Sequence, residues 1–421
     1  MHMRPRPRQE PIVNAGLTAE AFAESLRQRL APERWPLPIG SLPADTVLVG
    51  GAVRDAALGR LDEQPDLDLV VESEAIALGR SLARHHGGTC VVLDAERDMA
   101  RLVLKGWTVD IARREGPDLS SDLARRDFTV NAIALPLAPG SVAVDPTGGL
   151  THLLQRQLVA VAESNLVDDP LRLLRGVRLA AELNFTIEPT SLRWIERHAP
   201  AIAQVAGERV LAELEKLAEA PSGHQGLQQA WALGLLKPWG AQPAEGPIQP
   251  QLSPETAHAW GLTPEEVAEA LPIARLAWLL DGAAIGQLKG SRRLQQRCTT
   301  LRNWWAALER IPLAALPEEQ RLALHEQVDA DLPALLLGQP AEPCPTTLER
   351  WRDAHDPLFH PKPPLDGRDL QQALAIQPSP ELGELLRHLK RERAFGRLSD
   401  SDPEGAMGCA KQWLASRQPA A

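Results

Sequence analysis

The sequence predicts an α+β protein in which a small mixed or antiparallel sheet with helices precedes an all-helical remainder. Runs of β-favouring residues occur before Leu150 and nearly vanish after it, where apolar residues recur with helical spacing. At 421 residues the chain is too long for one ordinary domain. After an N-terminal arm we therefore expect a head (36–150), a helical neck (151–237), a helical body (238–340), and a Pro-rich linker with a helical tail (341–421).

The N-terminal arm, residues 1–35, is predicted to be basic and disordered. It begins Met-His-Met-Arg-Pro-Arg-Pro-Arg, which contains no apolar segment of a secretory signal. In the head, β-favouring runs occur at residues 46–49, 67–71, 90–93, 101–104 and 107–112. Helices are expected near residues 53–58 and 74–85. Lys105-Gly106 indicates a tight turn between two antiparallel strands.

Beyond the head, helical periodicity dominates the chain. Helices are expected at residues 171–183, 191–198, 209–218 and 226–236. Stretches rich in proline at residues 238–254 and 339–364 interrupt this pattern and are typical of linkers or domain boundaries. The sequence thus favours a helical stem that is divided into parts rather than one continuous bundle.

Composition limits the classes of function. The formal net charge of −10 argues against a nonspecific nucleic-acid coat, but it is compatible with a local basic surface. There is no run of about 18 apolar residues, so we expect no membrane span and no membrane partner. The four cysteines lack metal-ligand spacing, which is typical of reduced thiols in a cytoplasmic protein; they are Cys90, Cys298, Cys344 and Cys409.

Two nearby elements predict a site for a metal and a triphosphate. Asp66 and Asp68 alternate along a predicted strand, so both carboxylates leave the same face. Upstream, Gly50-Gly51 begins a helix at which a phosphate can approach the backbone amides, and Arg54 adds a planar donor fork. Each element alone is common without any ligand, but together they favour a divalent cation held by Asp66 and Asp68. Asp110 lies on a strand that could neighbour this one, either as a third acidic group or as an exposed strand residue.

A second charged cluster runs through residues 122–132. Arg125 and Arg126 suit a triphosphate, and Asp127 and Asn131 could hydrogen-bond a ribose hydroxyl. The plain alternative is a helix N-terminus with a charged first turn, in which Asp127 caps the helix. By itself, this cluster favours the plain alternative.

A third cluster could read a nucleotide base. Asp168 and Asp169 are typical of a helix cap, with Pro170 at the first helical position. Asp169, Arg172 and Arg175 recur every three residues, so they share one face, which is either an ordinary solvated face or a recognition surface. A carboxylate can accept from the exocyclic amine of cytosine or adenine while a guanidinium donates to the adjacent ring nitrogen. Such a pair would select CTP and ATP over UTP and GTP.

Taken together, these motifs resemble those of the bacterial class II tRNA nucleotidyltransferases, the CCA-adding family that also includes bacterial poly(A) polymerases. The matching series is Gly50-Gly51-Ala-Val-Arg54-Asp55, Asp66-x-Asp68, Arg125-Arg126-Asp127-Phe-Thr-x-Asn131-Ala, Asp145-Pro-x-Gly148-Gly149 and Asp168-Asp169-Pro-Leu-Arg172-x-x-Arg175. Gly207-Glu208-Arg209, followed by Glu213, is similar to the helix after the family's nucleotide pocket, and residues 365–370 are similar to the segment that opens its tail. The similarity is strong over residues 46–240 and weaker beyond them. One departure is Asp168, where the family usually has Glu.

The resemblance implies a polymerase-β-like nucleotidyltransferase head followed by an all-α neck, body and tail. It implies that Asp66 and Asp68 hold Mg²⁺ while a tRNA 3′-hydroxyl attacks the α-phosphate of CTP or ATP and pyrophosphate leaves. The predicted nucleotide-binding residues are Gly50, Gly51, Arg54, Arg126, Asp127, Asn131, Asp169, Arg172, Arg175 and Arg178. It also implies that the tail contacts the tRNA elbow, and the candidates are Arg387, Lys390, Arg391 and Arg393, which a solvated helix face would explain equally well.

The segment that joins Arg113 to Arg125 is short, because residues 114–124 number only eleven. Full CCA-adding relatives typically have a longer flexible loop there, and relatives without it tend to add only the two cytidines. We therefore hypothesise that this enzyme adds CC and leaves the terminal A to another protein, with full CCA addition as the alternative. Two other functions are a poly(A) polymerase using ATP on general RNA ends and a non-catalytic tRNA-binding scaffold. The acidic composition and the tail segment argue against the first, and the retained Asp and Arg motifs argue against the second.

Overall fold

The computed structural model describes residues 9–12, 18–244, 252–339, 345–399 and 402–417. The chain divides into two compact units, residues 1–205 with 233–235, and residues 206–232 with 236–421. The first unit is α+β and the second is helical, which confirms the predicted fold class. The finer division into neck, body and tail stays a prediction.

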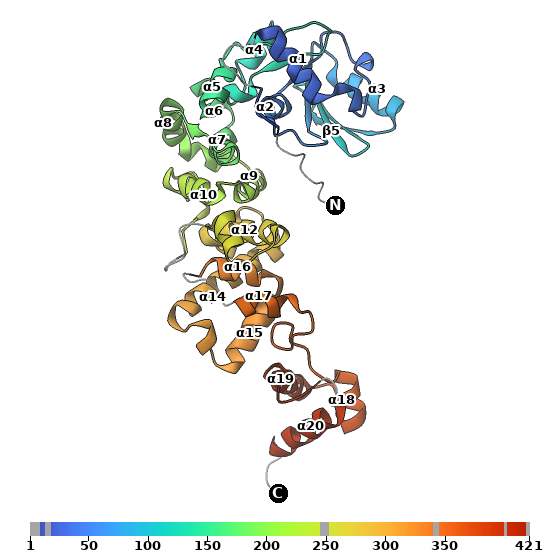
Figure 1. The fold of residues 1–421 in the computed structure, drawn as a ribbon, viewed down its shortest axis with the longest axis vertical. Helices are drawn as coiled ribbons and strands as arrows, with labels where there is room; N and C mark the ends of the chain where they lie inside the picture. The colour runs from blue at the N-terminus through green and yellow to red at the C-terminus, as the bar shows by residue number, and fades with distance from the viewer. Residues whose placement is uncertain (1–8, 13–17, 245–251, 340–344, 400–401, 418–421) are drawn as a thin grey trace. The chain divides into compact units, whose positions relative to one another are not determined.

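The first unit is built around a six-stranded mixed sheet (Figure 1). Its strands are β1 (Val47–Val49), β2 (Leu67–Val71), β3 (Thr89–Asp94), β4 (Met99–Leu104), β5 (Trp107–Arg113) and β6 (Ala134–Pro136), in the order β3-β4-β5-β2-β1-β6. Only the β2–β5 pair within this sheet is parallel. Lys105 and Gly106 both have positive φ and join β4 to β5, as predicted from the tight-turn signal.

The helices of this unit are α1 (Ala19–Leu30), α2 (Gly51–Leu58), α3 (Ala75–His86), α4 (Leu119–Leu123), α5 (Gly149–Gln155), α6 (Glu163–Asp168), α7 (Leu171–Leu183) and α8 (Pro189–His198). Short 3₁₀ helices cover Pro32–Arg34, Ile39–Ser41, Thr129–Asn131 and Ala199–Gln204. A second, two-stranded sheet pairs β7 (Gln157–Leu158) with β8 (Thr186–Ile187) in parallel.

Alternation along the strands gives the six-stranded sheet two different faces. Leu67, Leu69, Val109 and Ile111 are at most 1% exposed and lie on one face. Helix α3 packs on this face against β3, β4 and β5. The opposite face carries Asp68 and its neighbours in the adjacent strands, together with Val70 further along β2.

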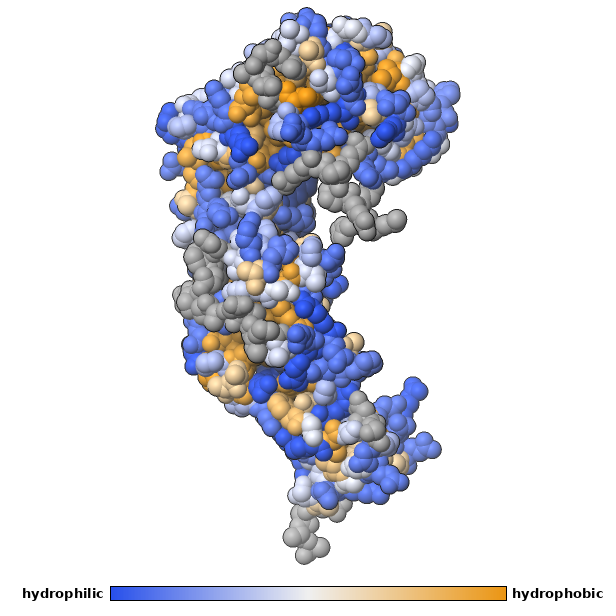
Figure 2. All heavy atoms as spheres, in the orientation of Figure 1, coloured by the Kyte–Doolittle hydropathy of each residue, from blue (hydrophilic) through white to orange (hydrophobic). Residues whose placement is uncertain are grey.

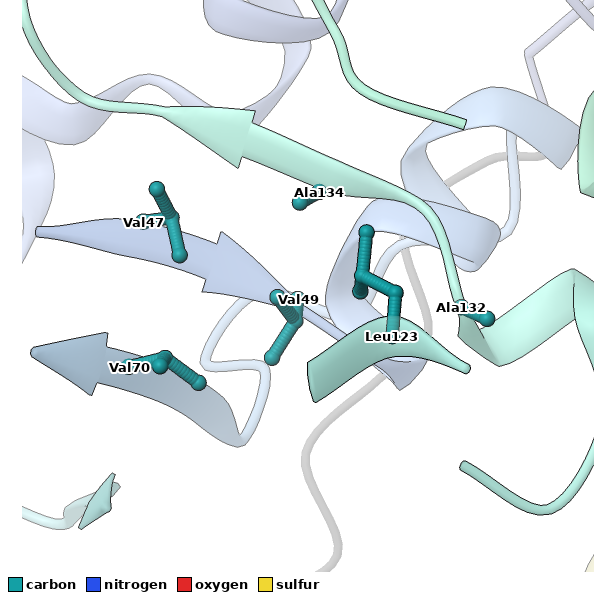
Figure 3. Close-up of a cluster of buried hydrophobic side chains, with 6 residues drawn as sticks. All are labelled: Val47, Val49, Val70, Leu123, Ala132 and Ala134. Atoms are coloured by element: carbon teal, nitrogen blue, oxygen red, sulfur yellow. The ribbon is translucent and has the colours of Figure 1, made fainter. Parts of the chain in front are cut away.

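Part of that opposite face is also covered (Figure 3). A small apolar cluster lies over β1, β2 and β6, with α4 contributing one side chain; its buried members are Val47, Val49, Val70, Leu123, Ala132 and Ala134. Further across the same face, Val91 of β3 and Val103 of β4 are exposed. Packing in this cluster therefore holds α4 close to the acidic residues of β2. On the same face, β3 and β4 stay accessible.

The prediction of a disordered N-terminal arm is wrong for residues 19–30. These residues form α1, in which Thr18 caps the N-terminus and Phe22 and Leu26 are buried. Helix α1 packs against α2. Burial of its apolar stripe at helical spacing outweighs the basic composition from which disorder was predicted. Residues 1–8 and 13–17 of the predicted arm lie outside the described residues.

The second unit contains α9 (Gly207–Glu219), α10 (Gly223–Ala232), α11 (Pro254–Ala259), α12 (Pro264–Leu279), α13 (Gly282–Gln287), α14 (Arg292–Arg310), α15 (Glu318–Val328), α16 (Leu332–Leu337), α17 (Pro345–Arg352), α18 (Gly367–Leu374), α19 (Pro380–Ala394) and α20 (Pro403–Arg417). Short 3₁₀ helices cover Lys237–Trp239, Leu313–Ala315 and Asp329–Asp331.

Helix α12 is the centre of this unit, because α9, α14 and α16 all pack against it. Arg275 of α12 is fully buried and donates to the carbonyl oxygens of Ala218 (2.7 Å), Ala220 (2.8 Å) and Leu252 (2.8 Å). The bonds to Ala218 and Ala220 satisfy carbonyls at the C-terminal end of α9 that have no partner within that helix. Near the C-terminus, α18, α19 and α20 share a separate apolar cluster around Leu385 and Leu389.

On the face shown in Figure 2, hydrophilic side chains predominate and apolar ones gather in smaller patches. No helix among the described residues is long and apolar enough to cross a bilayer.

Candidate functional site

Carboxylates gather on the partly open face of the sheet. The parallel register of β2 and β5 places Asp68 directly beside Asp110, and Asp66 immediately precedes β2. Asp66 is exposed and Asp68 is half-buried. Burial, together with the negative charges of Asp110 and Asp66, raises the pKa of Asp68 to about 6, against the opposing effect of Arg126. The fold thus concentrates negative charge where it is poorly solvated.

Gly50 makes room for one of these carboxylates. Its φ is +77°, and a Cβ atom at this position would lie 2.6 Å from Oδ2 of Asp68. A larger residue would therefore need both a strained backbone and a displaced carboxylate. Because Gly50 also precedes the first residue of α2, the turn brings the amino end of that helix next to Asp68.

The donor set fits a hard divalent cation. Carboxylate oxygens are the ligands that Mg²⁺ prefers, and a cation between Asp66 and Asp68 would relieve the repulsion that raises the pKa of Asp68. Oδ2 of Asp68 occupies the space that a Cβ at position 50 would need. Within the described ranges, no group of three or more His, Cys, Asp or Glu side chains is arranged to hold an ion. Asp110, the neighbour of Asp68, is instead bound to an arginine.

That arginine is Arg101, which lies opposite Asp110 in the antiparallel β4–β5 register. Its Nε donates to Oδ1 of Asp110 and its Nη2 donates to Oδ2, both at 2.8 Å. These hydrogen bonds raise the pKa of Arg101. The sheet register places Asp110 beside Asp68, and its role as a third acidic group of the metal site stays a prediction.

A cavity of about 240 Å³ adjoins this row. The sheet contributes Val70, Met99 and Ala112, which occupy the next position along the same face. The remaining lining consists of charged residues from the turn between β3 and β4, the end of β5, the segment around α4 and the junction of α6 with α7, namely Arg97, Arg113, Glu115, Asp122, Arg125, Arg126, Asp168, Asp169 and Arg172. The structure therefore brings together Arg126, Asp169 and Arg172, which lie far apart in the predicted motifs.

Arg126 has unused hydrogen-bonding capacity in this cavity. Its Nη2 lies 3.3 Å from Oδ2 of Asp122, but its Nε is buried without a hydrogen-bond partner. Buried donors without partners are rare in folded proteins. An anion in the cavity would supply the missing acceptor, as the prediction of a triphosphate ligand requires.

Arg172 is positioned by main-chain oxygens. Its Nη1 donates to the carbonyls of Arg125 and Asn165, both at 3.0 Å. Asn165 in turn donates to the carbonyls of Ala124 and Arg126, both at 2.8 Å. These bonds tie α6 and α7 to the segment that follows α4, so Arg172 and Arg126 keep a defined separation.

The predicted helix cap differs in detail. Asp168 is the last residue of α6, Pro170 is the N-cap of α7, and the helix begins at Leu171. Asp169 lies at the junction, where its Oδ1 accepts weakly from the Leu171 amide at 3.3 Å. Two short helices meet here because the extended backbone of Asp169 ends α6 before Pro170 starts the next turn.

Other predicted nucleotide-binding residues form a network in which Arg54, Asp127 and Asn131 are buried and Arg175 is exposed. Arg54 is 5% exposed, binds Asp55 through Nε (2.9 Å) and Nη2 (2.8 Å), and donates from Nη1 to Asn131 (2.8 Å). Asn131 donates to Asp127 (3.1 Å), which is also paired with Arg175 (2.8 Å). Burial alone would raise the pKa of Asp127, but Arg175 and the hydrogen bonds from Asn131 and a backbone amide lower it. The network connects α2 to α7, and direct contact of its members with a nucleotide stays a prediction.

Arg178 lies one turn further along α7. It is buried and paired with Glu182 on the same helix, and Nη2 of Arg54 lies 3.9 Å from the other oxygen of Glu182. Arg178 therefore borders the buried network rather than the cavity beside Arg126.

The sequence analysis missed Arg101 and Asn165. Arg101 was predictable in principle, because the Lys105-Gly106 turn pairs Leu104 with Trp107 and so sets Arg101 opposite Asp110. Asn165 carries no comparable signal, since its carbonyl partners become neighbours only when α6 folds against the segment after α4.

The four predicted tRNA contacts in the tail lie in different environments. Arg387 is exposed, whereas Lys390 pairs with Glu326 at 2.6 Å. Arg391 is half-buried beside Glu392. Arg393 is 8% exposed and donates to a backbone carbonyl at residue 362. Arg387 is therefore the member of the group with the most accessible guanidinium.

Comparison with known proteins agrees with this arrangement. The family described as "Poly A polymerase head domain" matches residues 46–159, and "Probable RNA and SrmB- binding site of polymerase A" matches residues 184–239. The CC-adding tRNA nucleotidyltransferase of Synechocystis sp. is 37% identical over 392 residues, covering 87% of this chain and 93% of the relative. A CC-adding tRNA nucleotidyltransferase of Geobacter sulfurreducens is 42% identical over 175 residues, covering 41% of this chain and 40% of the relative.

Solved structures share the fold. A CCA-adding enzyme in complex with CTP superposes with a TM-score of 0.68 at 23% identity, covering 89% of this chain and 91% of that one. The CCA-adding enzyme of Bacillus stearothermophilus in complex with CTP gives a TM-score of 0.66 at 22% identity, with coverages of 96% and 100%.

Proposed function

The chain belongs to the tRNA nucleotidyltransferase family, and from this premise we propose that it adds cytidines from CTP to the 3′ end of tRNA with release of pyrophosphate. The observation that carries the proposal is the charged cavity beside Asp66 and Asp68, in which Arg126 keeps a buried donor without a partner. Two relatives, one matching 87% and the other 41% of the chain, are named CC-adding tRNA nucleotidyltransferases.

Asp66 and Asp68 would hold the divalent cation that enzymes of this family use, which we propose to be Mg²⁺. When bound, it would lower the pKa of the attacking 3′-hydroxyl and neutralise charge on the departing pyrophosphate. Gly50 leaves room for the Asp68 carboxylate beside the amino end of α2. Backbone amides at Gly50 and Gly51 can therefore meet a phosphate close to the acidic residues.

Arg126 would bind the triphosphate. Its free Nε and the positive charge of its guanidinium suit a phosphate oxygen, and its Nη2 is already oriented by Asp122. Arg54 would act one step away: Asp55, its neighbour on the same helix, orients its guanidinium, and the bond to Asn131 ties α2 to the rest of the head. In this arrangement Arg54 orders the phosphate-binding turn.

Asp169 and Arg172 would read the base. Both line the cavity, and the carbonyl oxygens of Arg125 and Asn165 hold the Arg172 guanidinium in one position. A fixed guanidinium can donate to the ring nitrogen of cytosine while a carboxylate accepts from its exocyclic amine. Uracil presents the reverse order and would leave both groups unpaired, which is the basis of discrimination.

Addition of CC without the terminal A follows from the short segment at residues 114–124. This segment contains α4, whose N-cap Asp118 accepts from Ser121, and Leu123 of α4 is buried in the apolar cluster over β1. A segment that is capped at one end and packed at the other has little length left for a mobile loop. We therefore propose that the pocket keeps its preference for CTP throughout the reaction.

The test is extension, one nucleotide at a time, of tRNA transcripts that end before CCA, after C and after CC. We expect addition of two cytidines from CTP and no addition of A to the transcript that ends in CC. Efficient addition of A would overturn the CC-only proposal, and A tails on unrelated RNA would indicate a poly(A) polymerase. An Asp66→Ala variant should bind tRNA but incorporate nothing. Wild-type protein that is inert with all four nucleotides and Mg²⁺ would indicate a scaffold.

A further inference from the structure

Arg101 has no role in the proposed reaction, yet it lies at the end of the acidic row, next to Asp110. The β4–β5 register sets it opposite Asp110, and the β2–β5 register sets Asp110 beside Asp68. Two residues earlier on β4, Met99 lines the charged cavity. Asp68, Asp110 and Arg101 therefore form one continuous row across three strands, at the edge of that cavity.

The contact between Arg101 and Asp110 occupies both oxygens of the carboxylate. Each oxygen accepts one hydrogen bond at 2.8 Å in the parallel geometry that a guanidinium favours. The side chain of Arg101 is nevertheless 46% exposed, and that of Asp110 is 22% exposed. The arginine can thus move into solvent without unpacking the sheet.

We infer that Arg101 is an exchangeable counter-ion of Asp110, which sets whether two or three carboxylates are available to a divalent cation on this face. The inference rests on the proposed function, because it assumes that Asp66 and Asp68 bind such a cation. While Arg101 is paired, both oxygens of Asp110 accept from its guanidinium, so this carboxylate is not available as a ligand. When Arg101 moves away, Asp110 faces the cation from the neighbouring strand, and the released guanidinium is near the cavity.

Two other roles for Arg101 make different predictions. A fixed cross-strand ion pair would be a structural contact on an accessible surface, and its removal would leave cation binding almost unchanged. An arginine that holds Asp110 in the geometry needed for ligation would, when removed, weaken cation binding. Competition between Arg101 and the cation predicts the opposite change, because removing a nearby positive charge and freeing a ligand both favour the cation.

The experiment measures binding of Mn²⁺ alone to the full chain, from the electron paramagnetic resonance signal of free Mn²⁺. The site is defined as the Mn²⁺ binding that Asp68→Asn removes. For Arg101→Met we expect this site to bind Mn²⁺ roughly tenfold more tightly than wild type. Arg101→Lys keeps the charge but loses the two-point contact, so its Mn²⁺ affinity should lie between those of wild type and Arg101→Met. Arg197→Met is the matched control, because it removes an arginine paired with Glu163 at 2.9 Å elsewhere in the same unit.

A double-variant cycle separates ligand release from a simple change in charge. In an Asp110→Asn background, Arg101→Met should raise Mn²⁺ affinity clearly less than it does when Asp110 is present, because the positive charge is still removed but there is no ligand to release. Circular dichroism checks that each variant is folded. Unchanged or weaker binding in Arg101→Met, or an equal gain in both backgrounds, overturns the inference while the proposed function stands. If Asp68→Asn removes no Mn²⁺ binding, the proposed metal site fails, and the inference fails with it.

Discussion

At the scale of single residues, Asp68 shows a direct conflict between folding and charge. Its carboxylate is half-buried beside Asp110 and close above Gly50, and burial with the neighbouring charges raises its pKa to about 6. Burial of an unneutralised acid destabilises a fold. The position makes sense if a cation compensates the charge during the reaction.

The first prediction concerns the pH dependence of stability. As pH rises from about 4 to about 6, the unfolded chain loses the Asp68 proton before the folded chain does, so the free energy of unfolding falls. Above about pH 6 this loss of stability is complete. It amounts to about 2 kcal/mol in the free energy of unfolding after allowance for solvent screening at the Asp68 carboxylate. Asp68→Asn should therefore be more stable than wild type at neutral pH in EDTA, and the difference should disappear below about pH 4.

Denaturant unfolding of both proteins across this pH range checks the prediction. Glu96→Gln, which changes an exposed acid in the turn between β3 and β4, should show no such pH-dependent difference. A wild-type protein as stable as Asp68→Asn at neutral pH would contradict the assigned burial of charge.

The second prediction concerns Arg126. Replacement by alanine removes a charged donor from the triphosphate site. We expect kcat/KM to fall about 100-fold, which is the effect of losing one charge-assisted hydrogen bond. Arg126→Lys should recover part of this loss, because lysine supplies charge without the planar donor pair. Steady-state kinetics with CTP and a tRNA lacking CCA provide the measurement. Arg193→Ala, at an exposed position on α8, is the control and should stay near wild type.

At the scale of secondary-structure elements, the sequence predicted what local pattern determines. The alternation at residues 67–71 and the Lys105-Gly106 turn were enough to identify β2 and the β4–β5 hairpin. Long-range partners were not predictable in the same way. Arg54 was expected at a phosphate, but Asn131, which lies 77 positions later in the sequence, accepts from it inside the core. A side chain's partners come from tertiary packing, and a motif specifies only its residue types.

The third prediction tests α1, the element that the sequence analysis took for a disordered arm. Leu26 is completely buried, so Leu26→Ala should lower the free energy of unfolding by about 3 kcal/mol through lost contacts and a residual cavity. Gln28→Ala, on the exposed side of the same helix, should change it by less than about 0.5 kcal/mol. Chemical denaturation distinguishes the two. Equal, small effects would mean that α1 contributes little to the head.

At the scale of the whole molecule, charge is distributed unevenly. The chain is acidic overall, with a formal net charge of −10, yet the proposed substrate is a polyanion. Many of its arginines are already paired with acids; in the second unit, for example, Arg397 binds both Glu318 and Glu392. Contact with RNA must therefore depend on a small number of accessible cations rather than on overall attraction.

The fourth prediction follows for the tail. Arg387→Ala should weaken binding of full-length tRNA and reduce the slope of log affinity against log salt by about 1, because one phosphate contact is lost. Affinity for an acceptor-stem minihelix should not change. Titrations at several salt concentrations measure both quantities. Arg310→Glu, at the exposed end of α14, is the control. An unaltered slope in Arg387→Ala would show that Arg387 does not contact the tRNA.

The parallel pairing of β2 with β5 has a consequence for how this protein can change over evolution. Leu67, Leu69, Val109 and Ile111 alternate with the acids and are at most 1% exposed, so a shift of one residue would turn apolar side chains outward. The alignment of Asp68 with Asp110 is thus protected by the same burial that makes the sheet fold. Folded descendants of this chain can lose activity through substitution of an acid, but they cannot easily lose the geometry. An inactive relative could therefore regain its carboxylate row by one side-chain reversion.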